Sequence, residues 1–140
     1  MTVTPENPLG LDGFEFVEFT SPDPARMKAL IEQMGFTAYS KHRTKDVVRY
    51  KQGRINLLVN QEDAGQVAEF RAAHGPSANG MAFRVADAKS AYETALSRGA
   101  KAADAATGVL GEGSFALQGI GGSLLYFVDA GDLYADWEPV

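Results

Sequence analysis

The chain repeats one pattern of residues at a spacing of 64 positions. Residues 16–38, FVEFTSPDPARMKALIEQMGFTA, align with residues 80–102, GMAFRVADAKSAYETALSRGAKA. Three pairs of landmarks share this spacing: Phe19 and Phe83, Asp23 and Asp87, and Gly35 and Gly99. A repeat of this length indicates two copies of one supersecondary unit. We therefore expect one domain over 1–140 that contains two similar halves, about 12–60 and 78–129.

Each half predicts a strand, a helix and three further strands. Residues 14–19 and 81–85 alternate between apolar and polar side chains, as half-buried strands do. Asp23 and Asp87 are typical helix N-caps, and Gly35 and Gly99 suit the left-handed residue that follows a helix. The other predicted strands cover 36–42, 46–51 and 54–60 in the first half, and 100–105, 113–118 and 122–128 in the second. We expect a short linker helix over 64–73, and the tail 129–140 is compatible with another short strand.

Composition narrows the classes of function. The 140 residues carry a formal net charge of −5 and the pI is near 5.0, which argues against a nucleic-acid partner. There is no cysteine, so disulfides, thiolate zinc sites and a cysteine nucleophile are excluded. No run approaches the roughly 20 apolar residues of a membrane span, and the N-terminus lacks the pattern of a signal peptide. We therefore expect a cytoplasmic protein with no membrane partner.

The tandem units resemble the vicinal oxygen chelate superfamily, which includes glyoxalases, bleomycin-resistance proteins and dioxygenases. The resemblance implies an α+β fold in which two βαβββ units form a half-open barrel of mixed sheets, with helices outside. In that superfamily the metal ligands lie on the inner face of the first and last strands of each unit. The equivalent positions here are Phe16, Leu57, Gly80 and Tyr126, and a shift of one residue adds only Asn56. Hard metal ions need imidazole or carboxylate ligands, so we expect no metal-binding, cofactor-binding or catalytic residues in this chain.

Three polar residues outside those positions have more than one interpretation. The two histidines, His42 and His74, lack a spacing that would place them together, so we interpret both as structural loop residues that bond to nearby backbone. Glu18 is predicted to point inward from the first strand, where a buried carboxylate needs either a partner or a functional role. We favour pairing, with Arg84 or Arg54 as the partner.

A closer resemblance covers most of the chain. Five blocks carry it: NPLGLDGFEFVEFTSPDP (7–24), MGFTA (34–38), HRTKDVVRYKQGRINLLVN (42–60), HGPSANGMAFRVADAKSAYETALSRGAK (74–101) and GIGGSLLYFVD (119–129). They resemble the N-terminal domain of the 4-hydroxyphenylpyruvate dioxygenase family. The resemblance implies that Fe(II) is held by two histidines and a glutamate in a separate C-terminal domain, which converts 4-hydroxyphenylpyruvate and O2 to homogentisate in tyrosine catabolism. It also implies that the N-terminal domain carries no metal and serves packing and subunit assembly.

Three functions remain open at this point. The first is a structural domain that is inactive alone, forms a homodimer and has an iron-binding C-terminal domain as its partner. The second is a stand-alone, metal-free small-molecule-binding protein, with a pocket lined by Phe14, Phe16, Glu18, Leu57, Arg84 and Tyr126. The third is a metal-dependent enzyme with unusual ligands, which requires His42 or His74 inside the barrel. An open inner face would favour the binding protein, whereas an inner face filled by the chain's own side chains would favour the structural domain.

Overall fold

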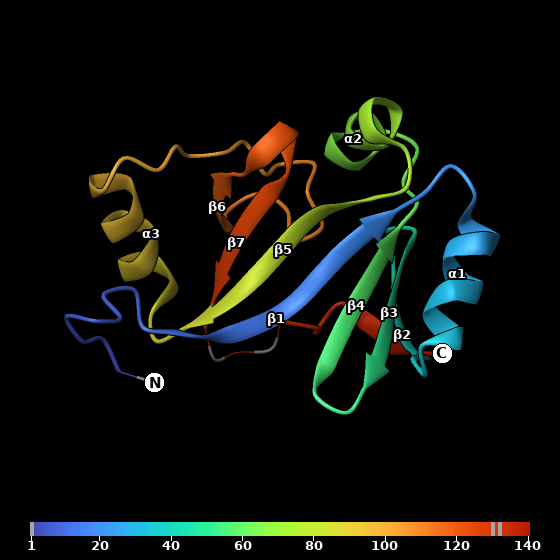
Figure 1. Cartoon of the computed structure of the whole chain (residues 1–140), viewed down its shortest axis with the longest axis horizontal. Helices are drawn as coiled ribbons and strands as arrows, with labels where there is room; N and C mark the ends of the chain where they lie inside the picture. The colour runs from blue at the N-terminus through green and yellow to red at the C-terminus, as the bar shows by residue number, and fades with distance from the viewer. Residues whose placement is uncertain (1, 130, 132) are drawn as a thin grey trace.

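The chain folds around one eight-stranded mixed sheet (Figure 1). The computed structural model describes residues 2–129, 131 and 133–140. The first unit consists of β1 (Leu11–Thr20), α1 (Pro24–Gln33), β2 (Thr37–His42), β3 (Val47–Gln52) and β4 (Ile55–Asn60). The second consists of β5 (Ser77–Val85), α3 (Ala88–Ser97), β6 (Phe115–Gln118), the single-turn helix η1 (Ile120–Gly122) and β7 (Leu124–Val128). Helix α2 (Gln66–His74) joins the two units, and β8 (Trp137–Pro139) follows them.

The two units meet at the centre of the sheet. The strand order is β6-β7-β5-β1-β4-β3-β2-β8. The first strands of the units, β1 and β5, pair with each other in antiparallel fashion. Each of them also pairs in parallel with the last strand of its own unit, β1 with β4 and β5 with β7. This α+β arrangement confirms the fold class that the repeat predicts.

The helices begin and end where the sequence pattern places them. The carboxylate of Asp23 accepts from the backbone N–H of Arg26 at 3.1 Å, which caps α1. The carboxylate of Asp87 accepts from the N–H of Ser90 at 2.9 Å and caps α3 in the same way. After both helices the chain turns at a glycine with a positive φ, 96° at Gly35 and 100° at Gly99. Glycine adopts this conformation without a steric penalty, so it ends each helix.

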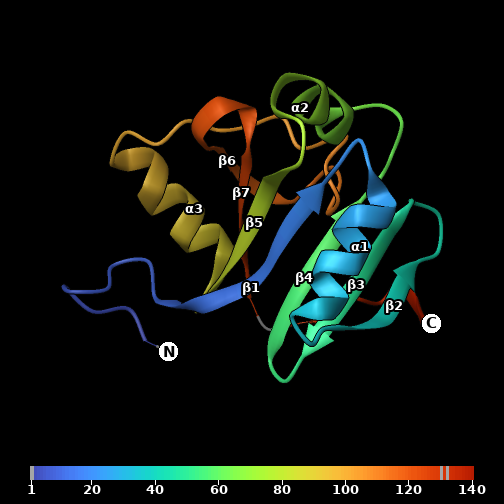
Figure 2. The ribbon, with the colours of Figure 1, turned by 45° about the vertical axis from the view of Figure 1, so that its right-hand side comes forward.

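Helices α1 and α3 cover the outer face of the sheet. Figure 2 shows α1 lying across β4 and β3, where its buried Ile31 packs with Tyr50, Leu57 and Val59. Helix α3 buries a stripe of alanines against Leu117 and Phe127: Ala88, Ala91 and Ala95. These stripes follow the helical period, so one face of each helix supplies the outer core. None of the helices in the part of the chain that the structure describes is both long and apolar enough to cross a membrane.

The second unit departs from the prediction in one strand. Residues 100–105 were expected to form a strand, but they make only an isolated bridge, between Ala102 and Leu117. The chain leaves the sheet there because Ala105 and Val109 turn into the core on the inner side. The predicted strand 113–118 is accordingly shortened to β6. The tail does form a strand, β8, which pairs with β2 of the first unit (Figure 1).

Candidate functional site

The inner face of the sheet, opposite α1 and α3, is the candidate site. Its central side chains come from four strands and are almost fully buried: Phe16 and Glu18 on β1, Leu58 and Asn60 on β4, Ala82 on β5, and Tyr126 on β7. Ala105 and Val109, from the loop before β6, pack into this core, and Leu133 and Trp137 of the tail pack beside them. The chain therefore fills the centre of its own inner face.

A β-bulge near the start of β1 changes which side chains face inward. Phe14 pairs with Phe83, whereas Phe16 pairs with the adjacent Ala82, so Glu15 is an extra residue on β1. An extra residue of this kind turns two successive side chains to one face. Glu15 and Phe16 both face inward as a result. Phe14 lies on the outer face, contrary to the prediction, with its ring 5.0 Å from that of Phe83.

Leu57 also lies on the outer face rather than the inner one. It packs with Ile31 beneath α1, and the side chains of β4 that face inward are Asn56, Leu58 and Asn60. The prediction counted residues from the turn before β4 and was wrong by one position. Because side chains alternate along a strand, a shift of one residue moves a side chain to the opposite face.

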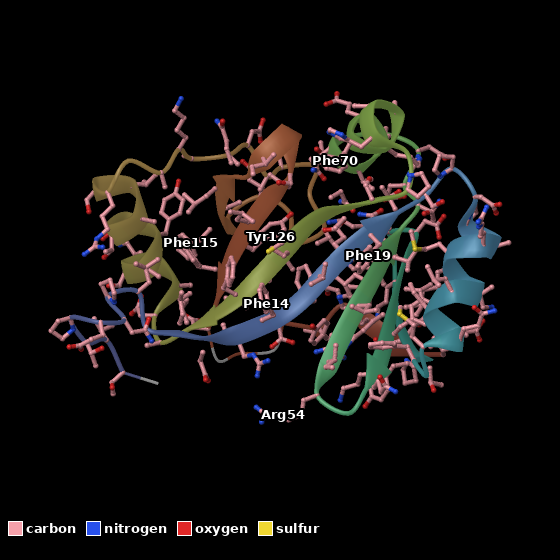
Figure 3. All side chains as sticks on the ribbon, in the orientation of Figure 1. Phe14, Phe19, Arg54, Phe70, Phe115 and Tyr126 are labelled. Carbon is pink, nitrogen blue, oxygen red and sulfur yellow. The ribbon has the colours of Figure 1, made fainter. Side chains whose placement is uncertain are left out.

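Glu18 is held by two amides instead of an arginine. Its Oε2 accepts from Nδ2 of Asn79 at 2.7 Å and from Nδ2 of Asn60 at 2.9 Å. The predicted pairing with Arg84 or Arg54 is therefore wrong. Figure 3 shows Arg54 at the turn between β3 and β4, the opposite end of β4 from Asn60, and its side chain is exposed.

The two amides that bind Glu18 are themselves fixed in orientation. Oδ1 of Asn60 accepts from the backbone N–H of Glu62 at 3.1 Å. Nδ2 of Asn79 also donates to Oε1 of Gln66 at 3.2 Å. Both NH2 groups are thus directed at the carboxyl group of Glu18. Burial raises the pKa of Glu18, and this effect exceeds the lowering by the two amides and by the charge of Lys45.

The hydroxyl of Tyr126 is buried beneath the loop before β6. The backbone of Val109 and Leu110 lies near it, but among the residues that the structure describes none makes a hydrogen bond of normal geometry with it. Burial, and after it the charge of Glu18, raises the pKa of Tyr126. Gly108 leaves room for this hydroxyl, because a Cβ at that position would overlap it. Lys45 holds the loop in place, as its Nζ donates to the carbonyl oxygens of Gly108 at 3.0 Å and Val109 at 2.9 Å.

A second polar cluster lies near the start of β1. This Glu15 cluster consists of Glu15, Arg49, Asn56, Arg84 and Tyr134. Oε2 of Glu15 accepts from the Tyr134 hydroxyl at 2.9 Å and from Nδ2 of Asn56 at 3.1 Å. Nε of Arg84 lies 3.6 Å from Oε1 of Glu15. Of these residues the sequence predicted Arg84 on the inner face and, with a shift of one residue, Asn56. The inward turn of Glu15 at the bulge and the contact of Tyr134 with Glu15 were not predicted.

The two histidines bond to backbone groups. Nδ1 of His42, at the end of β2, accepts from the N–H of Thr44 at 3.2 Å and from the N–H of Lys45 at 3.0 Å. Nε2 of His74, at the end of α2, lies 2.9 Å from the carbonyl oxygen of Gly121. Over the described ranges no three His, Asp or Glu side chains are grouped in a way that could hold a metal ion. The donors on the inner face thus do not match the ligand set that Fe(II) needs.

A cavity of about 680 Å³ lies beside the filled part of the inner face. The loop before β6, the end of β7 and the tail bound it. Its wall is partly apolar and partly polar, and includes Val109, Phe127, Trp137, His42 and Asp136. This volume is in the range of small-molecule sites.

The comparisons with known proteins agree with this architecture. The family model described as hydroxyphenylpyruvate dioxygenase, HPPD, N-terminal matches residues 5–136. A 4-hydroxyphenylpyruvate dioxygenase of Pseudomonas sp. (strain P.J. 874) is 48% identical over 124 residues, which are 89% of this chain and 35% of that protein. A 3-dehydroshikimate dehydratase of Pseudomonas aeruginosa is 36% identical over 120 residues, 84% of this chain and 19% of that protein.

A solved structure shows the same fold. It is a xylose isomerase-like TIM barrel/4-hydroxyphenylpyruvate dioxygenase fusion protein, with a TM-score of 0.81 and 34% identity. The match covers 93% of this chain and 21% of that chain. This chain therefore spans about a third of the length of the Pseudomonas dioxygenase and a smaller part of the fusion protein. The family match, over nearly the whole chain, shows that this chain belongs to the family of hydroxyphenylpyruvate dioxygenase N-terminal domains.

Proposed function

We propose that this chain acts as the metal-free, structural N-terminal domain of a 4-hydroxyphenylpyruvate dioxygenase. In this role the reaction of 4-hydroxyphenylpyruvate with O2 to homogentisate takes place in a separate domain, which holds Fe(II). The chain supports that domain by packing and by subunit assembly, and it has no turnover alone. The observation that carries the proposal is the filled inner face, where Phe16, Leu58 and Tyr126 occupy the centre of the sheet.

The ligand chemistry of the inner face supports the same role. Glu18 is the carboxylate at its centre, and its Oε2 is already bonded to two amides. The neighbouring inward side chains, Phe16 and Ala82, offer no ligand atom, and the hydroxyl of Tyr126 stays protonated because burial raises its pKa. A mononuclear Fe(II) centre with two histidines and a carboxylate has no counterpart in this set.

Two relatives with different named activities also support a structural role. Segments similar to this chain occur in a protein named as a dioxygenase and in one named as a dehydratase. These two activities require different chemistry at the reacting centre. A domain that is compatible with both is better explained by a structural role than by a catalytic one.

The decisive experiment combines this chain with the remainder of the Pseudomonas sp. dioxygenase. Three samples are compared for iron content and for turnover of 4-hydroxyphenylpyruvate: this chain alone, the relative without its own N-terminal domain, and a chimera in which this chain replaces that domain. We expect iron and turnover in the chimera, and neither in this chain alone. Stoichiometric iron with turnover by this chain alone would overturn the proposal, as would a folded chimera that remains inactive.

The metal-free binding protein is the second candidate, and one observation favours it. The cavity of about 680 Å³ beside the tail has room for a small organic molecule. Screening the chain against small aromatic compounds by calorimetry tests this alternative. Saturable binding that is lost in Glu112→Trp, which places a bulky ring at an exposed position of the cavity wall, would favour it over the structural role.

We also propose that the chain is cytoplasmic and that it forms a homodimer. On the outer face, between the two helices, Phe14 is 53% exposed and Ile55, at the start of the neighbouring strand, is 56% exposed. A second subunit that covers both side chains would remove this apolar surface from water. We expect a homodimer, and sedimentation equilibrium of the wild type and of Phe14→Ser tests it. A monomer in both samples would reject the dimer without affecting the chimera experiment.

A further inference from the structure

His42 connects two walls of the cavity of about 680 Å³, the tail and the loop before β6. On the tail side, His42 pairs with Trp137 between β2 and β8, and the centres of the two rings are 5.3 Å apart. The backbone N–H of the next residue, Arg43, donates to the carbonyl oxygen of Asp136 at 2.9 Å. The end of β2 therefore anchors the tail against the cavity.

His42 also fixes the turn that carries Lys45. Nδ1 of the His42 ring accepts from the backbone N–H groups of Thr44 and Lys45, at 3.2 Å and 3.0 Å. These two hydrogen bonds close the turn after β2. From this turn, Nζ of Lys45 donates to the carbonyl oxygens of Gly108 and Val109 in the loop before β6. One imidazole ring thus supports both walls of the cavity.

Only the neutral form of the His42 ring is compatible with this turn. Because Nδ1 accepts from two N–H groups, the ring proton lies on Nε2. A second proton would go to Nδ1, where it would face the N–H groups of Thr44 and Lys45. The hydroxyl of Thr44, 3.4 Å from Nδ1, could accept from the protonated ring, but the two backbone hydrogen bonds would still be lost. Protonation of His42 and the closed turn therefore exclude each other.

The charged groups around the His42 ring come from several segments. The charge of Lys45, in the turn, opposes a second proton on the ring, whereas Asp136 in the tail and Glu62 after β4 favour it. Two more carboxylates line the same cavity, those of Glu112 and Asp129. Burial has the largest effect, and together with Lys45 it lowers the pKa of His42 below its usual 6.5. The closed turn thus resists the proton more than an open turn in water would.

We propose that His42 is a proton-operated latch that releases both walls of the cavity at mildly acidic pH. Protonation of Nδ1 opens the turn after β2, so that the tail loses its anchor and the ammonium group of Lys45 leaves the loop before β6. The cavity then opens to solvent on these two sides. Because opening takes up one proton, the ratio of open to closed latch rises by up to about tenfold for each pH unit of acidification. The latch goes beyond the proposed structural role and does not depend on it.

Amide hydrogen exchange of the full chain, from about pH 5 to about pH 8, tests the latch. Each rate is corrected for the intrinsic effect of pH on exchange. In wild type we expect the protection of residues 105–110 and 134–140 to fall together below about pH 6.5, by up to about tenfold per pH unit. Strands β1 and β4 should stay better protected than both segments at every pH, because the sheet itself does not open.

Two variants control the experiment. In His42→Asn, Oδ1 of the new side chain can accept from the same two N–H groups but does not titrate, so protection of both segments should not change with pH. His74→Asn replaces the other histidine, which bonds to the carbonyl oxygen of Gly121 away from the latch, and should keep the full pH response.

Three results would overturn the latch: no response in wild type, a response in only one of the two segments, or the same response in His42→Asn. Equal protection of β1 and the two segments would also overturn it, because the whole sheet would then be opening. If His42→Asn does not fold, wild type alone decides the question. The indole N–H resonance of Trp137 should then shift with the same pH midpoint as the ring protons of His42, and a Trp137 resonance that does not follow this midpoint rejects the latch.

Discussion

Asn79 and Glu18 join the two halves of the repeat inside the core. The amide nitrogen of Asn79, on β5, lies 2.7 Å from Oε2 of Glu18, on β1, across 61 positions of sequence. Both side chains are almost fully buried, at 0% and 1% exposure. A carboxyl group in such a place keeps its proton to higher pH than it would in water, because burial disfavours the charged form.

We predict that Glu18→Gln becomes more stable than wild type as the pH rises. The pKa of Glu18 in the folded chain is above its usual 4.5. The stability linked to this group is full below the unfolded pKa and is lost as the pH rises through the folded pKa. The glutamine side chain cannot ionise, so it avoids this loss. Urea unfolding of both chains from about pH 4 to about pH 8 measures the difference. A difference that does not change with pH would contradict the buried-carboxyl explanation.

Gly108→Ala is predicted to destabilise the chain through Tyr126. The new methyl group would overlap the buried hydroxyl, and we expect a loss of about 1–3 kcal/mol in the free energy of unfolding. Tyr126→Phe alone should cost less than about 1 kcal/mol, because the hydroxyl that it removes has no partner among the described residues. In the double variant the part of this cost that comes from the hydroxyl should disappear, while the close contacts of the methyl group with Leu124 and Ala105 remain. Additive effects in this double-mutant cycle would show that the two groups do not compete for one space.

Lys45→Met should loosen the loop that covers the inner face. The substitution removes the donor to the carbonyl oxygens of Gly108 and Val109 and keeps much of the apolar stem. We expect a loss of about 1–3 kcal/mol, typical of hydrogen bonds to a charged group. Amide hydrogen exchange over residues 105–110 should become faster. Lys41→Met, at an exposed position of β2, is the matched control and should leave this exchange unchanged.

We predict that His42 lowers the free energy of unfolding at mildly acidic pH, because the unfolded chain binds a proton there more readily than the folded chain. Burial, followed by the charge of Lys45, lowers the pKa of His42 below its usual 6.5. The unfolded chain therefore takes up this proton first, and stability that is present above pH 6.5 is lost as the pH falls through the folded pKa. In His42→Asn this part of the pH dependence should be absent. Trp137, whose ring centre is 5.3 Å from that of His42, reports the unfolding by fluorescence. If wild type and His42→Asn show the same dependence of stability on pH, a group other than His42 causes it.

Much of the fold was predictable because its signals are local. The helix caps at Asp23 and Asp87 and the terminating glycines mark α1 and α3 directly. The repeat then indicated the tandem units, since two copies of one unit bury their apolar faces against each other. The strand at 100–105 was the exception. Its side chains are compatible with a strand, but Ala105 is buried by a loop that packs on the inner face.

The candidate site was harder to predict because its contacts are long-range. The period of two along a strand holds until a bulge adds a residue, and the bulge at Glu15 therefore reversed the predicted face of Phe14. Glu18 was correctly predicted to point inward, but its partners, Asn60 and Asn79, lie 42 and 61 positions away. Charge alone suggests an arginine as the partner of Glu18. The arrangement of the strands shows that two amides bind its carboxyl group instead.

The two tandem units and the positions where α1 and α3 begin and end can be predicted from the sequence alone. These features depend on residue types at fixed local spacings, which can be read along the chain. Three features depend on the folded arrangement of the strands and the tail: the filled inner face, the contacts of Lys45 with the covering loop, and the position of Tyr134 beside Glu15. These features involve contacts between segments that are far apart in the sequence. The free energy of such contacts depends on three-dimensional packing, which cannot be predicted from a local sequence pattern.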